Sequence, residues 1–136
     1  MLPRALVVED DAPTREALRA LIEYERLTVE VAVDGEQALG MLMQRDYDVI
    51  LLDIALPKIS GADLMDHLAS TRPQILERII VVTGLDVADI RKLFPTVCTA
   101  LAKPVIPSRL RECVRRCLTP AAETGSAGST SKISVA

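Results

Sequence analysis

The segment that most constrains the fold is the four-residue run Val49-Ile50-Leu51-Leu52, which ends at the carboxylate of Asp53. A strand that alternates apolar and polar residues can leave one face in water, whereas this run has no polar face. Strands of this kind belong to parallel sheets that are covered by helices on both faces. The run therefore predicts a central strand, with Asp53 at the point where the strand emerges into solvent.

Similar short runs alternate along the chain with longer segments of helical period, which is the pattern of successive strand-helix units. Five such pairs can be counted. The expected strands are Ala5–Val8, Thr28–Ala32, Asp48–Asp53, Arg78–Thr83 and Val97–Leu101. The expected helices are Pro13–Glu25, one that starts at Asp34-Gly35-Glu36, one from Gly61 to Arg72, then Asp86–Phe94 and Ser108–Leu118. The chain is thus expected to be an α/β protein with a parallel sheet.

Composition sets the size of the protein and excludes some functions. With 136 residues, 49% of them hydrophobic, the chain is long enough for about one domain with its own core. A net charge of -3 argues against a general nucleic-acid surface, because phosphate backbones are held by clustered Lys and Arg. No segment resembles a signal peptide or approaches the ~18 apolar residues of a membrane span. We expect a cytoplasmic protein without direct nucleic-acid or membrane contact.

The last 18 residues, 119–136, differ in composition from the rest. Fourteen of them are Thr, Pro, Ala, Gly or Ser, which bury little apolar surface. The sequence therefore predicts one folded domain over residues 1–118, followed by a disordered tail that is too short for an effector domain.

The three cysteines cannot all pair with one another. Cys113 and Cys117 lie four residues apart in an apolar helical pattern, as small buried side chains do, so packed and reduced thiols are expected. Metal binding by sulfur is discounted, because zinc needs four ligands and His67 is the only histidine. Three methionines are also expected to fill the core: Met41, Met43 and Met65.

Polar side chains stand at the ends of four of the expected strands. They are Glu9-Asp10-Asp11, Asp53, Thr83-Gly84 and Lys103-Pro104. Open α/β sheets bind ligands at the carboxyl ends of their strands, so these groups are expected at one edge, where they make a phosphoryl-accepting site. A phosphoryl donor brings about two negative charges, and the acids would repel it unless a divalent cation were bound. Mg2+ is the natural choice, because it prefers oxygen ligands.

The order of these motifs resembles the receiver domain of two-component response regulators. The motifs concerned are Val7-Val8-Glu9-Asp10-Asp11, then Asp53 with Leu56-Pro57 and Ser60-Gly61, then Thr83-Gly84, then Lys103-Pro104. The resemblance covers Arg4 to about Leu118. It implies a flavodoxin-like (βα)5 three-layer sandwich with a parallel sheet of order 2-1-3-4-5.

By this resemblance Asp53 is the phosphoacceptor, and Thr83 and Lys103 hold oxygens of the phosphoryl group. Mg2+ is the implied cofactor, with Mn2+ as a substitute. The implied ligands are Asp10, Asp53 and the backbone carbonyl of Ala55, with Glu9 acting through a bound water. Asp11 either caps the first helix or faces solvent. The Lys103-Pro104 bond resembles the cis peptide of the family.

The resemblance also implies a signalling role. The chain would take a phosphoryl group from a phosphohistidine on a sensor histidine kinase or a histidine phosphotransfer protein, and would then bind a downstream protein differently. The resemblance also leaves open whether the chain forms a homodimer. Self-phosphorylation and slow autodephosphorylation would be its only reactions, so it is not expected to be an enzyme. The implied docking surface is the first helix with the loop after the last strand, and the implied output face is the fourth helix, last strand and last helix.

Two departures from the family pattern concern output and lifetime. Ala100 stands three residues before Lys103, where many receivers carry Tyr or Phe, and the stretch from Thr83 to Lys103 is slightly short. We therefore expect a trimmed or displaced fourth helix and a response through backbone movement, or a modest structural effect. Ala55 and Leu85 offer no base for hydrolysis of an acyl phosphate.

Three other classes fit the residues less well. A phosphohydrolase of the haloacid-dehalogenase type needs a second acid two residues after its nucleophile, where this chain has Ala55. A receiver-like interaction scaffold that works without phosphorylation predicts loss of an acid, the Thr or the Lys, and none is lost. A flavodoxin needs hydroxyls and N-H groups in its first loop, where this chain has three acids.

Overall fold

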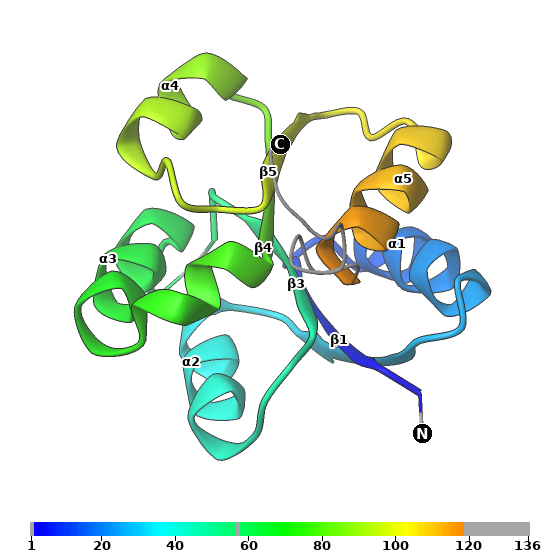
Figure 1. The fold of residues 1–136 in the computed structure, drawn as a ribbon, viewed down its shortest axis with the longest axis horizontal. Coiled ribbons are helices and arrows are strands. Elements are labelled where there is room, and N and C mark those ends of the chain that lie inside the picture. Colours follow the sequence, from blue (N-terminus) through cyan, green and yellow to red (C-terminus); the bar gives the residue numbers. More distant parts are fainter. Residues whose placement is uncertain (1, 57, 119–136) are drawn as a thin grey trace, which may run out of the picture.

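The structure of the protein is a computed structural model that describes residues 2–56 and 58–118. Five parallel strands form one sheet of order β2-β1-β3-β4-β5 (Figure 1). The strands are β1 (Arg4–Val8), β2 (Thr28–Ala32), β3 (Val49–Asp53), β4 (Ile79–Thr83) and β5 (Thr99–Ala102). The helices are α1 (Ala12–Tyr24), α2 (Gly35–Gln44), α3 (Gly61–Thr71), α4 (Val87–Leu93) and α5 (Pro107–Leu118). This is the expected flavodoxin-like strand order.

The helices cover the sheet on both faces, which makes the three-layer sandwich that the apolar strands require. Helices α1 and α5 lie together on one face, and α2, α3 and α4 lie on the other (Figure 1). Two core clusters result, one on each side of the sheet. All five residues of β3 and of β4 are buried, whereas the edge strand β2 is only partly buried. The central position predicted for the run before Asp53 is therefore confirmed.

Short polar side chains start the helices that follow the strands. Asp11 caps α1 by accepting a 3.0 Å hydrogen bond from the Thr14 N-H, which decides between the two roles expected for it. Asp34 caps α2 through the Gln37 N-H at 2.7 Å. Such caps satisfy backbone donors that have no partner inside the helix, and they fix where each helix begins.

Gly61 allows α3 to start directly against the end of β3. Its N-H donates a 2.9 Å hydrogen bond to the carbonyl of Ile54. A Cβ at this position would lie 2.5 Å from the Ile54 Cα and 2.6 Å from the Asp53 carbonyl oxygen, closer than real contacts allow. Gly61 therefore makes room for α3 to approach the backbone that carries Asp53.

The cysteine prediction is wrong. Cys98 and Cys117 form a disulfide, and only Cys113 is a free, buried thiol. The sequence did not predict this pair because the two cysteines lie in different elements: Cys98 just before β5 and Cys117 in α5. They are brought together by the packing of α5 on the sheet.

Other departures from the expected elements are small. Met65 is buried and Met41 partly so, but Met43 is 71% exposed because α2 turns Ala38 and Leu42 toward the sheet instead. The last strand starts at Thr99 rather than at Val97. A 3-10 helix, η1 (Pro73–Arg78), joins α3 to β4 and was not expected.

The predicted tail over residues 119–136 lies outside the described residues. Within the described part of the chain, none of the helices combines the length and apolar composition that crossing a bilayer requires.

Candidate functional site

The ends of β1 and β3 bring three carboxylates together. Val8 pairs with Leu52 across these neighbouring strands, so the residues that follow, Glu9 and Asp53, leave the sheet side by side. Each of Glu9, Asp10 and Asp53 has a carboxylate oxygen within 4.8 Å of the others. Glu9 and Asp53 are buried, whereas Asp10 is exposed. The acid cluster expected at this edge is therefore present.

Lys103 joins this cluster from the far side of β4. Its ammonium lies 2.9 Å from Asp53 Oδ2 and 3.2 Å from Glu9 Oε1. Its backbone N-H donates a 2.8 Å hydrogen bond to the Thr83 carbonyl, which fixes the start of the side chain. The Lys103-Pro104 peptide is cis, as the family resemblance implied. One cation thus contacts two buried carboxylates.

Burial and charge shift the protonation of these groups. Burial raises the pKa of Glu9, and the Asp53 charge adds to this, while the Asp11 N-H and Lys103 oppose it. Burial alone would lower the pKa of Lys103, but its hydrogen bonds to Asp53 and Glu9 outweigh burial and raise that pKa. Lys103 is therefore held as a cation between the two buried carboxylates of Glu9 and Asp53.

Backbone donors also hold the two buried acids. The Ala55 N-H donates a 3.0 Å hydrogen bond to Asp53 Oδ1, and the Asp11 N-H donates one of 3.2 Å to Glu9 Oε2. These contacts fix the carboxylates where the strands end. The carbonyl of Ala55 as a metal ligand stays a prediction.

Thr83 ends the strand between those of Asp53 and Lys103. It is fully buried, and its Oγ1 accepts a 2.9 Å hydrogen bond from the Leu85 N-H. Val82 is the register partner of Asp53, so Thr83 lies one position further along the neighbouring strand. A hydroxyl that accepts one hydrogen bond can still donate its own proton. The Thr83 hydroxyl thus remains available as a donor at this edge.

Arg15 is a functional neighbour that the sequence did not reveal. Its Nη1 donates hydrogen bonds to the carbonyls of Glu9 at 3.1 Å and Asp10 at 3.3 Å. The Arg15 side chain thus extends from the start of α1 toward the preceding loop and fixes the backbone of its acidic residues. The only signal was a basic residue within one or two helical turns of the acids, which is too common a pattern to single out.

Comparison with known proteins decides the family. The family described as "Response regulator receiver domain" matches residues 5–115. The chain belongs to this family.

The chain is similar to part of longer response regulators and to nearly the whole of some solved receiver structures. Response regulator MprA of Mycobacterium ulcerans is 37% identical over 86 residues, which are 63% of this chain and 36% of that protein. The chain thus spans about a third of the length of the curated relatives it matches. A CheY-like receiver domain from Methanospirillum hungatei shares 28% identity with a TM-score of 0.76, over 87% of this chain and 94% of that one. TrrA of Thermotoga maritima, solved in complex with Mg(2+)-BeF, shares 26% identity with a TM-score of 0.76, over 86% and 100%.

The acidic cluster of this receiver domain is compatible with a metal ion. Its donors are carboxylate oxygens close enough to share one ion, and a hard divalent cation such as Mg2+ prefers such ligands. Three acids against one ammonium leave negative charge that a divalent cation would balance. The residues present therefore fit Mg2+.

The aromatic residue common in receivers is missing from β5. Ala100 occupies its place and is buried. The three aromatic side chains of the protein lie elsewhere: Tyr24 is exposed, Tyr47 hydrogen-bonds to Glu30, and Phe94 packs in a core cluster. Helix α4 spans only seven residues, which agrees with the trimmed helix expected here. The surface formed by α4, β5 and α5 therefore has a short helix and carries no aromatic side chain at position 100.

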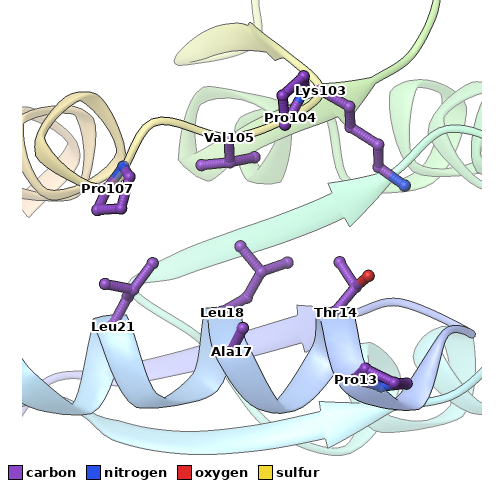
Figure 2. Close-up of a pocket in the computed structure, with 9 residues that line it drawn as sticks. All are labelled: Pro13, Thr14, Ala17, Leu18, Leu21, Lys103, Pro104, Val105 and Pro107. Atoms are coloured by element: carbon purple, nitrogen blue, oxygen red, sulfur yellow. The ribbon is translucent and has the colours of Figure 1, made fainter.

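A pocket of about 670 Å3 opens beside the site, between α1 and the segment after β5. Side chains from α1 and from this segment face each other across it, and the Lys103 side chain runs from its upper wall toward the strand ends (Figure 2). The α1 side is lined by Pro13, Thr14, Ala17, Leu18 and Leu21. The opposite side is lined by Lys103, Pro104, Val105 and Pro107. The pocket is largely apolar apart from its end at Lys103.

Proposed function

We propose that this receiver domain accepts a phosphoryl group on Asp53 from a phosphohistidine of a sensor histidine kinase or a histidine phosphotransfer protein. The observation that carries the proposal is the convergence of buried Asp53 with Glu9, Asp10 and Lys103 at one strand edge. A carboxylate held at a strand end by a backbone N-H is fixed in place for attack on phosphorus.

The transfer exchanges one bond for another. An oxygen of the Asp53 carboxylate attacks phosphorus, and the bond from phosphorus to the donor imidazole nitrogen breaks, so the electron pair of that bond leaves with the imidazole. Lys103, 2.9 Å from Asp53 Oδ2, can donate to an oxygen of the group attached there. The buried Thr83 hydroxyl would supply a second donor from the neighbouring strand.

Mg2+, with Mn2+ as a substitute, would be held by Asp10, Asp53 and the carbonyl of Ala55, with Glu9 acting through water. When bound, the ion supplies positive charge that lowers the repulsion between these acids and the incoming phosphoryl group. Arg15 and Asp11 hold the acidic loop, and Lys103 partly neutralises the buried carboxylates of Glu9 and Asp53.

The pocket between α1 and the loop after β5 supports a docking role for this face. It is apolar, it is open, and Lys103 forms one end of it, so a partner helix seated there would lie beside the reacting carboxylate. A phosphohistidine on that helix would then reach Asp53 without passing through the core. We assign the donor protein to this pocket and the downstream protein to the face of α4, β5 and α5.

The same proposal covers the fate of the phosphoryl group. Ala55 and Leu85 are both exposed beside the site, and neither carries an acid or base that could activate water. Loss of the group by the domain itself is therefore slow, and solvent access and partner proteins set its lifetime. Such a protein works in the cytoplasm, where it relays a signal and releases no product of its own.

Reductive trapping tests the position of the acyl phosphate. Borohydride converts an aspartyl phosphate to homoserine, so peptide mapping after treatment with phosphoramidate, Mg2+ and borohydride identifies the modified residue. We expect homoserine at position 53, and none in Asp53→Asn. Asp66→Asn, which removes an exposed carboxylate on α3, is the matched control and should be modified at Asp53 like the wild type. Modification of a different carboxylate, or of none, would refute the proposal.

A further inference from the structure

The Cys98–Cys117 disulfide joins the sheet to the end of the last helix. Cys98 lies just before β5, and Cys117 lies in the last turn of α5, with 6.3 Å between their Cα atoms. Both residues are only partly buried. The remaining cysteine, Cys113, lies one turn earlier on α5 and is 4% exposed. The bonded pair is thus more accessible to solvent than the free thiol beside it.

The bond adds a covalent link at the end of α5, beyond its fully buried side chains. Cys98 is held at the sheet by a 2.9 Å hydrogen bond from its N-H to the Ile79 carbonyl. The buried side chains of α5 end at Val114, one turn before Cys117. Arg115 ties the same turn to Glu25 at 2.8 Å, in an ion pair whose Arg115 side is exposed to solvent. Cleavage of the disulfide would remove the one covalent link between this turn and the sheet and leave it held by noncovalent contacts, among them the partly buried Leu118 against the core.

The two bonded residues also adjoin the walls of a hollow of about 510 Å3 formed by α4, β5 and α5. On the β5 wall, Thr99 follows Cys98 directly, and on the α5 wall, Arg116 precedes Cys117 directly. The hollow is rich in cations: its lining includes Arg91, Arg109 and Arg116, with Glu112 as its one acid. A bond between neighbours of both walls sets how far apart these walls lie.

We propose that Cys98 and Cys117 are a reversible redox-modification site, and that their oxidation state sets the shape of this hollow. A disulfide oxidant of low molecular weight, such as oxidised glutathione, supplies the exchange. The two thiols lose two electrons and two protons, one sulfur-sulfur bond forms between Cys98 and Cys117, and the oxidant is reduced to two thiols. A dithiol reverses the reaction.

This site offers a second control of the face to which we assign the downstream protein, and in that respect it rests on the proposed function. Ala100 lines the same hollow and carries no aromatic ring whose rotation could reshape it. The disulfide acts on the same surface at the start of β5, whereas Lys103 lies just after the end of that strand. Oxidation would therefore affect recognition by the partner even where Asp53 stays unmodified.

Two measurements on the whole chain test the proposal. In the first, the native protein is treated with oxidised glutathione or with dithiothreitol, alkylated with iodoacetamide and mapped by mass. We expect a Cys98–Cys117 linked peptide after oxidation, and alkylation of both residues but little of Cys113 after reduction. A link that involves Cys113, or a bond that native protein does not release to dithiothreitol, overturns the proposal.

In the second, amide hydrogen exchange is compared between the oxidised and reduced forms of the same wild-type chain. We expect severalfold faster exchange at Arg115–Leu118 and around Thr99 after reduction, with no change in α2. Cys113→Ser should keep this difference, and Cys98→Ser should lose it. Equal exchange in the two wild-type forms overturns the proposal. Phosphoryl uptake, measured in parallel, separates the two proposals, because its failure in both forms contradicts the role of Asp53 alone.

Discussion

The ammonium of Lys103 donates a 2.9 Å hydrogen bond to Asp53 Oδ2, although the two residues are 50 positions apart. Asp53 ends β3 and Lys103 follows β5, and these two strands are not neighbours in the sheet. The same nitrogen lies 3.2 Å from Glu9 Oε1. Both carboxylates are almost fully buried, so the ammonium is their main source of compensating positive charge within the described residues. The stability of the domain and the chemistry of its site therefore depend on one side chain.

Lys103→Ala should destabilise the domain in the absence of divalent cations. Two buried acceptors lose their charged donor, which costs roughly 1–3 kcal/mol of unfolding free energy. Added Mg2+ should recover much of this loss, because it binds the folded site. Urea unfolding with and without Mg2+ measures both effects. Lys92→Ala, an exposed substitution on α4, is the control, and equal stability of the two variants contradicts the role given to Lys103.

Gly61→Ala should destabilise the domain and displace Asp53. The added methyl group would press on the Ile54 Cα and the Asp53 carbonyl, and overpacking of this kind costs about 1–3 kcal/mol. Gly40→Ala is the matched control, because nothing lies within 4 Å of its Cβ position in α2. This control should gain about 0.5–1 kcal/mol from higher helix propensity. Thermal unfolding compares them, and a Gly61→Ala protein as stable as wild type would show that the close approach is relieved at no cost.

Arg15→Ala should weaken Mg2+ binding without removing any proposed ligand. Arg15 holds the carbonyls of Glu9 and Asp10, and loss of a group that positions metal ligands reduces affinity roughly tenfold. Isothermal titration with Mg2+ measures the change. Arg19 lies one turn further along α1 and, among the described residues, pairs with Glu16 and Glu23 of the same helix. Arg19→Ala should therefore bind Mg2+ as wild type does. Equal affinities for the two variants would exclude a positioning role for Arg15.

Tyr47 should make the domain sensitive to alkaline pH. Burial and the hydrogen bond to Glu30 raise the pKa of Tyr47 from 10.0 to about 12. The folded state therefore holds the phenolic proton more tightly than the unfolded state. The contribution of Tyr47 to the free energy of unfolding is complete below pH 10.0 and is lost as pH rises toward about 12. The stability advantage of wild type over Tyr47→Phe should shrink across this interval. Urea unfolding along a pH series tests this, with Tyr24→Phe, at an exposed tyrosine, expected to follow wild type; parallel curves for wild type and Tyr47→Phe contradict it.

The sequence predicted the sheet well because its strands carry a strong local signal. Val49–Asp53 and Ile79–Thr83 have no polar face, and this alone requires helices on both sides. The order of Glu9, Asp53, Thr83 and Lys103 at strand ends then placed these residues at one edge, because parallel strands end together. The boundaries of β5 were less certain, since an edge strand that is only partly buried has a weak pattern.

What the sequence could not provide are contacts that depend on packing between distant segments. The Cys98–Cys117 bond requires α5 to lie against the start of β5, and no spacing along the chain encodes that approach. The hydrogen bonds of Arg15 to the acidic loop depend on the direction in which α1 leaves Asp11. Residue type alone did not predict the exposure of Met43, because this hydrophobic residue faces solvent although it lies one position from the buried Leu42.

The most direct test of the central claim is the intact mass of the protein after incubation with phosphoramidate and Mg2+. The account predicts that wild type gains one phosphoryl group, that chelation of Mg2+ before the donor is added prevents the gain, and that Asp53→Asn gains none while it unfolds cooperatively. No gain by the wild type, or an equal gain by Asp53→Asn, would contradict the assignment of Asp53 as the phosphoacceptor.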